Sequence, residues 1–139
     1  MNAKLICTAI LALAPAFAAA EPSPTETCID ALASEPRLQV LADKVALARS
    51  TQARLVRVAD RTPSQMERAA IAVWLEKRNT CFDAGAEQRA QMTAPERAFH
   101  RSVFVFQQRL VADLQGGRLT YAEFNHRRAE LAQAAGLEI

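Results

Sequence analysis

Three short motifs of the form Thr-x-x-Glu or Thr-x-x-Gln constrain the fold of this chain more than any other feature. In such a capping box the threonine hydroxyl accepts a hydrogen bond from the backbone N–H three residues on, and the side chain at that position accepts one from the threonine N–H. The boxes run from Thr62 to Gln65, from Thr93 to Glu96 and from Thr120 to Glu123. Each precedes apolar residues at helical spacing, so the sequence predicts three helix starts and an all-α fold.

The apolar residues behind the first two boxes predict a pair of long helices, over residues 63 to about 91 and 94 to about 115. We expect one face of each helix to lie in the core of a small bundle. The faces are Ile71, Trp74, Leu75, Arg78, Phe82 and Gly85, with Cys81 at the edge, and Phe99, Val103, Phe106, Leu110 and Leu114, widened by Phe104 and Val111. The link between the helices is so short that they must pack as antiparallel neighbours.

The glycine pair at residues 116–117 predicts the end of the second long helix and the start of a shorter third one. Glycine adopts the left-handed conformation that commonly follows a helix. Leu119 and Phe124 flank the Thr120 cap at the spacing of a hydrophobic staple. The same stretch resembles the second half of a calcium-binding loop, but the positions that must supply side-chain oxygens hold none, which excludes that site. These positions are Ala112, Leu114 and Gly116.

Residues 107–134 resemble a known family. The matching residues are Leu110, Leu114, Gly117, Leu119, Thr120, Glu123, Phe124, Arg128 and Leu131. They follow the pattern of the short C-terminal helical hairpin called SHOCT, apart from the doubled glycine and Asp113, which stands where an apolar residue is common. The resemblance implies an interaction or oligomerisation element and no particular chemistry.

A second stretch, residues 61–71, is similar to the Leu-Thr-x-x-Gln helix starts of the Spy and CpxP family of periplasmic proteins. Thr62 and Gln65 carry the similarity, and Arg61 stands where the family has leucine. This resemblance implies a stress chaperone or a metal-responsive sensor.

The N-terminus predicts export. Lys4 precedes an apolar run and residues 18–20 are three alanines, which together form a secretory signal peptide over residues 1–20. The apolar run is too short to span a bilayer comfortably. We therefore expect a periplasmic or secreted protein with one helical domain over residues 21–139, beginning with a flexible lead-in at 21–25.

Removal of the signal peptide leaves two cysteines, Cys28 and Cys81, and an oxidising compartment predicts a disulfide between them. Short helices are expected over residues 25–34 and from Pro36 onward, the second carrying Leu38, Leu41 and Val45. The bond would tie these helices to the long one. Residues 46–61 fit either a short helix or an extended segment.

Arg78 lies on an apolar face beside Trp74 and is the residue that most needs an explanation. Its guanidinium must reach solvent, stack on Trp74 or meet a carboxylate such as Asp30 or Glu123. We expect a structural ion pair, and the alternative is a role for Trp74 and Arg78 in binding a partner.

The two histidines suggest a metal site, because His100 lies four residues after Glu96, and His126 lies near Glu123 and Glu130. Such pairs are also common on helix surfaces, and a specific site needs three or four ligands that converge. No metal and no cofactor are therefore expected.

The remaining features argue against several classes of function. With 17 lysines and arginines against 15 acidic residues, the chain has no excess of positive charge for nucleic acid. It lacks the glycine-rich phosphate loop, the nucleophile elbow and the zinc-protease motif. We expect a non-enzymatic protein with a structural or protein-interaction role, which could also form a homo-oligomer. The alternative is the chaperone or sensor that the second resemblance implies.

Overall fold

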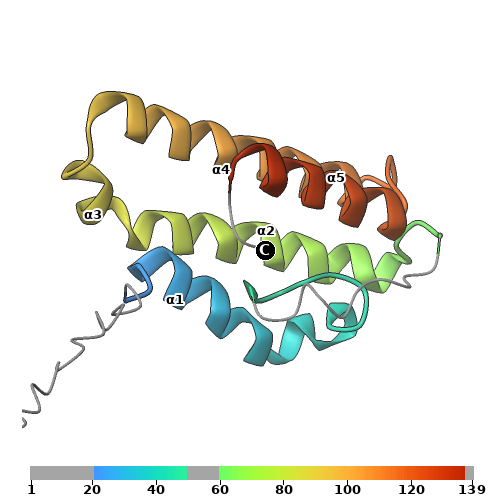
Figure 1. The fold of residues 1–139 in the computed structure, drawn as a ribbon. Coiled ribbons are helices and arrows are strands. Elements are labelled where there is room, and N and C mark those ends of the chain that lie inside the picture. Colours follow the sequence, from blue (N-terminus) through green and yellow to red (C-terminus); the bar gives the residue numbers. More distant parts are fainter. Residues whose placement is uncertain (1–20, 50–59, 137–139) are drawn as a thin grey trace, which may run out of the picture.

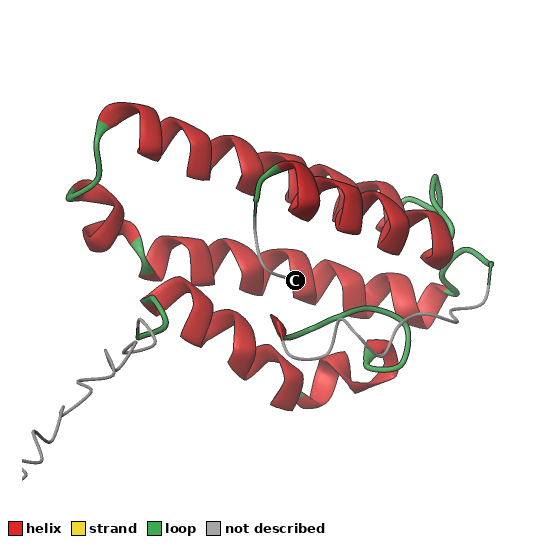
Figure 2. Ribbon diagram, in the orientation of Figure 1, coloured by secondary structure: helices red, strands yellow, loops and turns green. Residues whose placement is uncertain are grey.

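The structure is a computed structural model, and it describes residues 21–49 and 60–136. The predicted signal peptide and most of the segment 46–61 lie outside these residues. The described residues form helices and no strand, which confirms the all-α fold (Figure 2). In chain order the elements are α1 (Pro24–Ala31), the 3-10 turns η1 (Leu32–Ser34) and η2 (Pro36–Leu41), α2 (Gln65–Ala84), α3 (Ala86–Ala90), α4 (Ala94–Gln115) and α5 (Tyr121–Ala134).

The long helices α2 and α4 pack as antiparallel neighbours, and α2 lies between α4 and the N-terminal elements (Figure 1). Helix α5 runs back along the C-terminal part of α4. Helix α1 begins at Pro24, so the predicted lead-in is shorter than expected. Proline is suited to this first position because its missing N–H would have no partner there.

Capping boxes begin four helices. The predicted boxes at Thr93 and Thr120 are confirmed. A further box, from Ser23 to Glu26, begins α1 and had not been predicted.

The predicted cap at Thr62 with Gln65 is wrong. The cap of helix α2 lies two residues later, at Ser64, and Glu67 is its partner in the capping box. The two motifs overlap in sequence, and tertiary contacts favour the second one because Arg61 donates two hydrogen bonds to the Glu67 carboxylate, each 2.7 Å long.

Glycines set two helix ends. Gly85 separates α2 from α3, where one continuous helix had been expected to residue 91. A Cβ at Gly85 would lie 2.1 Å from Thr25 Oγ1, so the close approach of α1 requires glycine here. Gly117 has the positive φ of 71° that was predicted after α4. The N–H of Arg118 then donates to the carbonyl of Asp113, which closes the α4 end.

A single hydrophobic core connects all parts of the described chain. Its largest fully buried members come from four elements: Trp74 and Ile71, Leu114 and Val111, Tyr121 and Phe124, and Leu38 and Leu41. The Trp74 and Phe124 rings meet edge to face, with their centroids 6.0 Å apart. The N-terminal elements therefore share the core of the helix hairpin.

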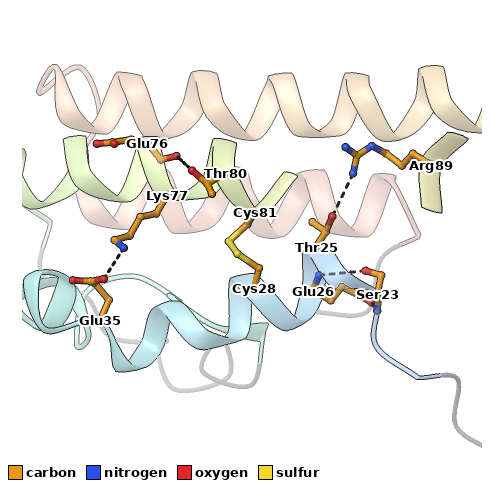
Figure 3. The surroundings of a disulfide bond; sticks show 10 residues. All are labelled: Ser23, Thr25, Glu26, Cys28, Glu35, Glu76, Lys77, Thr80, Cys81 and Arg89. Atoms are coloured by element: carbon orange, nitrogen blue, oxygen red, sulfur yellow. Dashed lines mark hydrogen bonds and ion pairs between the residues drawn. A yellow bond between two sulfur atoms is a disulfide. The ribbon is translucent and has the colours of Figure 1, made fainter. Parts of the chain in front are cut away.

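The predicted disulfide between Cys28 and Cys81 is confirmed, with Cα atoms 5.2 Å apart (Figure 3). It joins α1 to the C-terminal part of α2. An ion pair of 2.7 Å between Lys77 and Glu35 lies on one side of the bond, and a hydrogen bond from Arg89 to Thr25 lies on the other. The bond and its flanking contacts hold the N-terminal elements along α2.

The predicted burial of the whole α4 stripe is wrong in the N-terminal part of the helix. Leu110 and Leu114 are buried, but Phe99 and Phe106 are each 47% exposed. For Phe99 the reason is length, because the 22 residues of α4 span about 33 Å and the 14 residues of α5 span only about 21 Å. Figure 1 shows α5 ending before it reaches the N-terminal part of α4.

Candidate functional site

The shortness of α5 leaves an open groove where the core would otherwise continue. The groove has a volume of about 410 Å³ and is bounded by α1, the α2–α3 junction, the N-terminal half of α4 and the end of α5. Val103, Phe104 and Gln107 of α4 line it, on the face that is buried further along the helix as Leu110 and Val111. Its volume falls within the range of about 300–1,000 Å³ that is usual for ligand sites.

Arg78 of α2 lines this groove and is buried, with only 4% of it exposed. Its Nε donates to Gln108 Oε1 at 2.9 Å and its Nη2 donates to Gln107 Oε1 at 2.6 Å. Both acceptors are neutral amides. Burial lowers the pKa of Arg78 to about 9, so the guanidinium remains charged at neutral pH.

The predicted ion pair of Arg78 with Asp30 or Glu123 is therefore wrong. Asp30 accepts from Arg49 instead, at 2.7 Å, and Glu123 accepts from the N–H of Thr120 in the capping box. The predicted contact with Trp74 is confirmed, because the guanidinium carbon of Arg78 lies 5.5 Å from the centroid of that ring.

Arg128 of α5 also lines the groove, and it is half-buried. Its Nη1 donates to the carbonyl of Ala46 at 2.7 Å, and burial lowers its pKa to about 10. Its guanidinium carbon lies 5.8 Å from the Trp74 ring centroid. The two cations thus share one aromatic neighbour, and the charge of Arg128 also lowers the pKa of Arg78.

Neither arginine forms an ion pair with a carboxylate among the described residues. The carboxylates near the groove serve other cations, since Glu26 and Asp30 both pair with Arg49 at its rim, at 2.8 Å and 2.7 Å. A buried cation without a counter-charge is costly, and proteins usually compensate for it. Arg78 and Arg128 therefore make the groove a site that favours negative charge.

The wall of the groove beside α3 is aromatic. Phe82 and Phe104 stack with their centroids 4.0 Å apart, and the guanidinium of Arg89 lies 3.6 Å from the Phe82 centroid. Ile29 of α1 adds an aliphatic surface on the opposite side. The groove thus combines buried positive charge with apolar walls.

Sequence reasoning placed Trp74 and Arg78 on the correct face but missed Arg128 and the two glutamines. Arg128 follows the exposed Arg127, and the resemblance to the SHOCT pattern, which includes Arg128, implies no contact with Arg78. Gln107 and Gln108 reach Arg78 only because of the register between α2 and α4.

The structure does not bring the predicted metal ligands together. His126 Nε2 lies 3.3 Å from Glu130 on the exposed face of α5, and Glu96 accepts from Thr93 in its capping box. His100 is exposed on α4 and borders the groove. Within residues 21–49 and 60–136, no three His, Cys, Asp or Glu side chains are grouped in a way that could hold a metal ion.

Comparison of the chain with protein-family models, curated proteins and solved structures found no match. In the part of the chain that the structure describes, no helix has the length and apolar character needed to cross a bilayer.

Proposed function

We propose that this is an exported, non-enzymatic protein that binds a partner protein through exposed aromatic side chains of α4. The binding surface is the α4 strip, defined as Phe99, Ser102 and Phe106. The signal-like N-terminus and the disulfide support export to an oxidising compartment. The resemblance of residues 107–134 to an interaction hairpin supports the same class of function.

The observation that carries the proposal is the exposure of two phenylalanines on one helix face. Phe99 and Phe106 are seven residues apart, so they lie on the same side of α4, and 47% of each is exposed. The strip leads directly into Leu110, which the bundle buries. Exposed aromatic side chains next to a core are typical of a surface that a partner covers.

Charge indicates what kind of partner fits. Arg109 is exposed on α4 and lies beside the strip, because it follows Phe106 by three residues, whereas the exposed Arg97 and Arg101 lie on the opposite side of the helix. Both carboxylates of the helix are engaged, Glu96 by its capping box and Asp113 by Arg118 at 2.6 Å. An amphipathic helix with an acidic residue opposite Arg109 complements this surface.

The test compares capture of partners by strip variants. Oxidised protein is immobilised, exposed to the exported fraction of the cell, and compared with Phe99→Ser/Phe106→Ser. Val105→Ser is the matched control, because Val105 is an exposed apolar residue on the same helix, about 100° around the axis from Phe106. We expect the double variant to lose an acidic partner that the wild type and the control both retain. Equal retention by all three proteins would contradict the proposal.

The alternative function is a stress chaperone of the Spy and CpxP kind, which the similarity of residues 61–71 suggests. Its support is the same exposed aromatic surface, which would also bind unfolded chains. Suppression of the aggregation of an unrelated unfolded protein, at substoichiometric amounts, distinguishes the two functions. A partner-specific protein will not suppress aggregation, and a chaperone will.

A further inference from the structure

We infer that the groove binds an organic carboxylate with an apolar body, held by Arg78 and Arg128. The carboxylate would lie against the two guanidinium groups and the apolar body against Phe82 and Phe104. The inference is independent of the α4 strip, because neither Phe99 nor Phe106 lines the groove.

Arg78 and Arg128 each have N–H donors that form no hydrogen bond with the described residues. A guanidinium has five N–H groups, and it matches the two oxygens of a carboxylate. Among the described residues, Arg78 uses only its Nε and Nη2, and Arg128 uses only its Nη1. Both side chains line the groove, so their unused donors are available to a ligand that enters it.

Arg78 and Arg128 also lack a negatively charged partner among the described residues. The Arg78 and Arg128 guanidinium groups meet amide and carbonyl oxygens, and no carboxylate in residues 21–49 or 60–136 pairs with them. Two like charges beside one tryptophan ring repel each other. One bound anion would relieve both the repulsion and the lack of compensation.

The walls of the groove decide between a simple anion and an amphiphile. Ile29, Phe82, Val103 and Phe104 line the groove and offer apolar surface next to the charged site. An inorganic anion would leave this surface exposed to water. A carboxylate with an alkyl or aryl body would cover it, which adds the free energy of apolar burial to that of the ion pairs.

Calorimetric titration of the oxidised protein tests the inference with decanoate as the probe. Acetate keeps the charge without the tail, and decanol keeps the tail without the charge. We expect decanoate to bind, and acetate and decanol to bind at least tenfold more weakly, because each lacks one half of the recognition. Decanol that binds as tightly as decanoate would overturn the inference, since the arginines would then contribute nothing.

Variants assign the binding to the two arginines. Arg78→Met and Arg128→Met should each weaken decanoate binding about tenfold or more, because each removes charge-assisted hydrogen bonds. Arg101→Met is the matched control, since Arg101 is exposed on α4 and does not line the groove, and it should change the affinity less than twofold. Unchanged affinity in both groove variants would overturn the inference.

Lysine variants provide a second comparison that keeps the positive charge at both positions. Arg78→Lys and Arg128→Lys keep the charge but lose the planar fork, so they should bind decanoate more weakly than wild type and more tightly than the methionine variants. If a methionine variant does not fold, the affinities of the lysine variants and the wild type are compared instead.

Glu138 lies outside the described residues, and its carboxylate could compete with the ligand. Decanoate binding that appears only in Glu138→Gln would mean that the anion belongs to the chain itself, and would overturn the inference.

Discussion

Glu67 illustrates at the scale of one residue how the chain around α2 is held. Only 4% of it is exposed, and its carboxylate accepts two hydrogen bonds from Arg61 and one from the N–H of Ser64, all at 2.7 Å. Lys44 lies 3.7 Å away. One side chain thus caps α2 and holds the residues on both sides of segment 50–59.

The charge on Glu67 makes stability depend on pH. The hydrogen bonds from Arg61 are the main reason that its pKa falls from 4.5 to about 2. A lowered pKa in the folded state means that the contribution to stability is fully present above pH 4.5 and is lost as the pH falls towards about 2. We predict that Glu67→Gln lowers the free energy of unfolding by about 2 kcal/mol at pH 7, and by much less near pH 2.

Urea unfolding at pH 7 and near pH 2 measures both values. Glu76→Gln is the matched control, because Glu76 is an exposed glutamate of the same helix, and it should change stability little at either pH. A Glu67→Gln effect of the same size at both pH values would mean that the ionised carboxylate is not what stabilises this region.

The sequence predicted single residues well where their role is local. Thr93 and Thr120 cap their helices as expected, because a capping box needs only four consecutive residues. Thr62 failed because Arg61 and Lys44 stabilise the competing box at Ser64, and those contacts belong to the folded chain. The position of Arg128 in the groove could not be predicted, because it depends on how α5 docks against α2 and α4.

At the scale of the elements, α1 and the α2–α3 junction fit together through Gly85. Gly85 is buried, and a Cβ there would lie 2.1 Å from Thr25 Oγ1. No local signal shows that this glycine is needed, since Thr25 is sixty residues away in the chain. The length of the helix after residue 63 was overestimated for this reason.

We predict that Gly85→Ala destabilises the protein by about 1–3 kcal/mol, because either α1 or the junction must move to make room. Adding Thr25→Ala removes the closest atom and should recover most of the loss, which a double-mutant cycle by thermal unfolding would measure. Gly116→Ala is the control, because its φ is −70° and its Cβ would meet mainly the flexible Arg118. Equal losses at both glycines, without recovery, would contradict the role given to Thr25.

At the scale of the whole molecule, one core and one disulfide make the described chain a single unit. Leu38 and Leu41 from the N-terminal elements lie in the same cluster as Trp74 and Phe124. The disulfide spans 53 positions in sequence, and closing a loop of that size contributes up to about 4 kcal/mol in the chain-entropy model. The all-α fold and this bond could be predicted because both depend on patterns in the sequence itself.

The groove could not be predicted, because it depends on how far α5 reaches. The sequence shows that α5 is shorter than α4, but it does not show which part of α4 is left without α5 beside it. Phe99 and Val103 have the same periodicity as Leu110 and Leu114, so all four were expected in the core. The structure separates them because α5 ends before it reaches the N-terminal part of α4.

We propose that the α4 strip is an unoccupied binding surface in the free protein. Hydrogen exchange along α4, on oxidised protein at two dilute concentrations, tests it most directly. We predict weaker protection over residues 98–104 than over 107–113 at both concentrations, because α5 covers only the second stretch. Equal protection over both stretches, unchanged by dilution, would mean that the α4 strip is already covered in the free chain. That result would contradict the proposal.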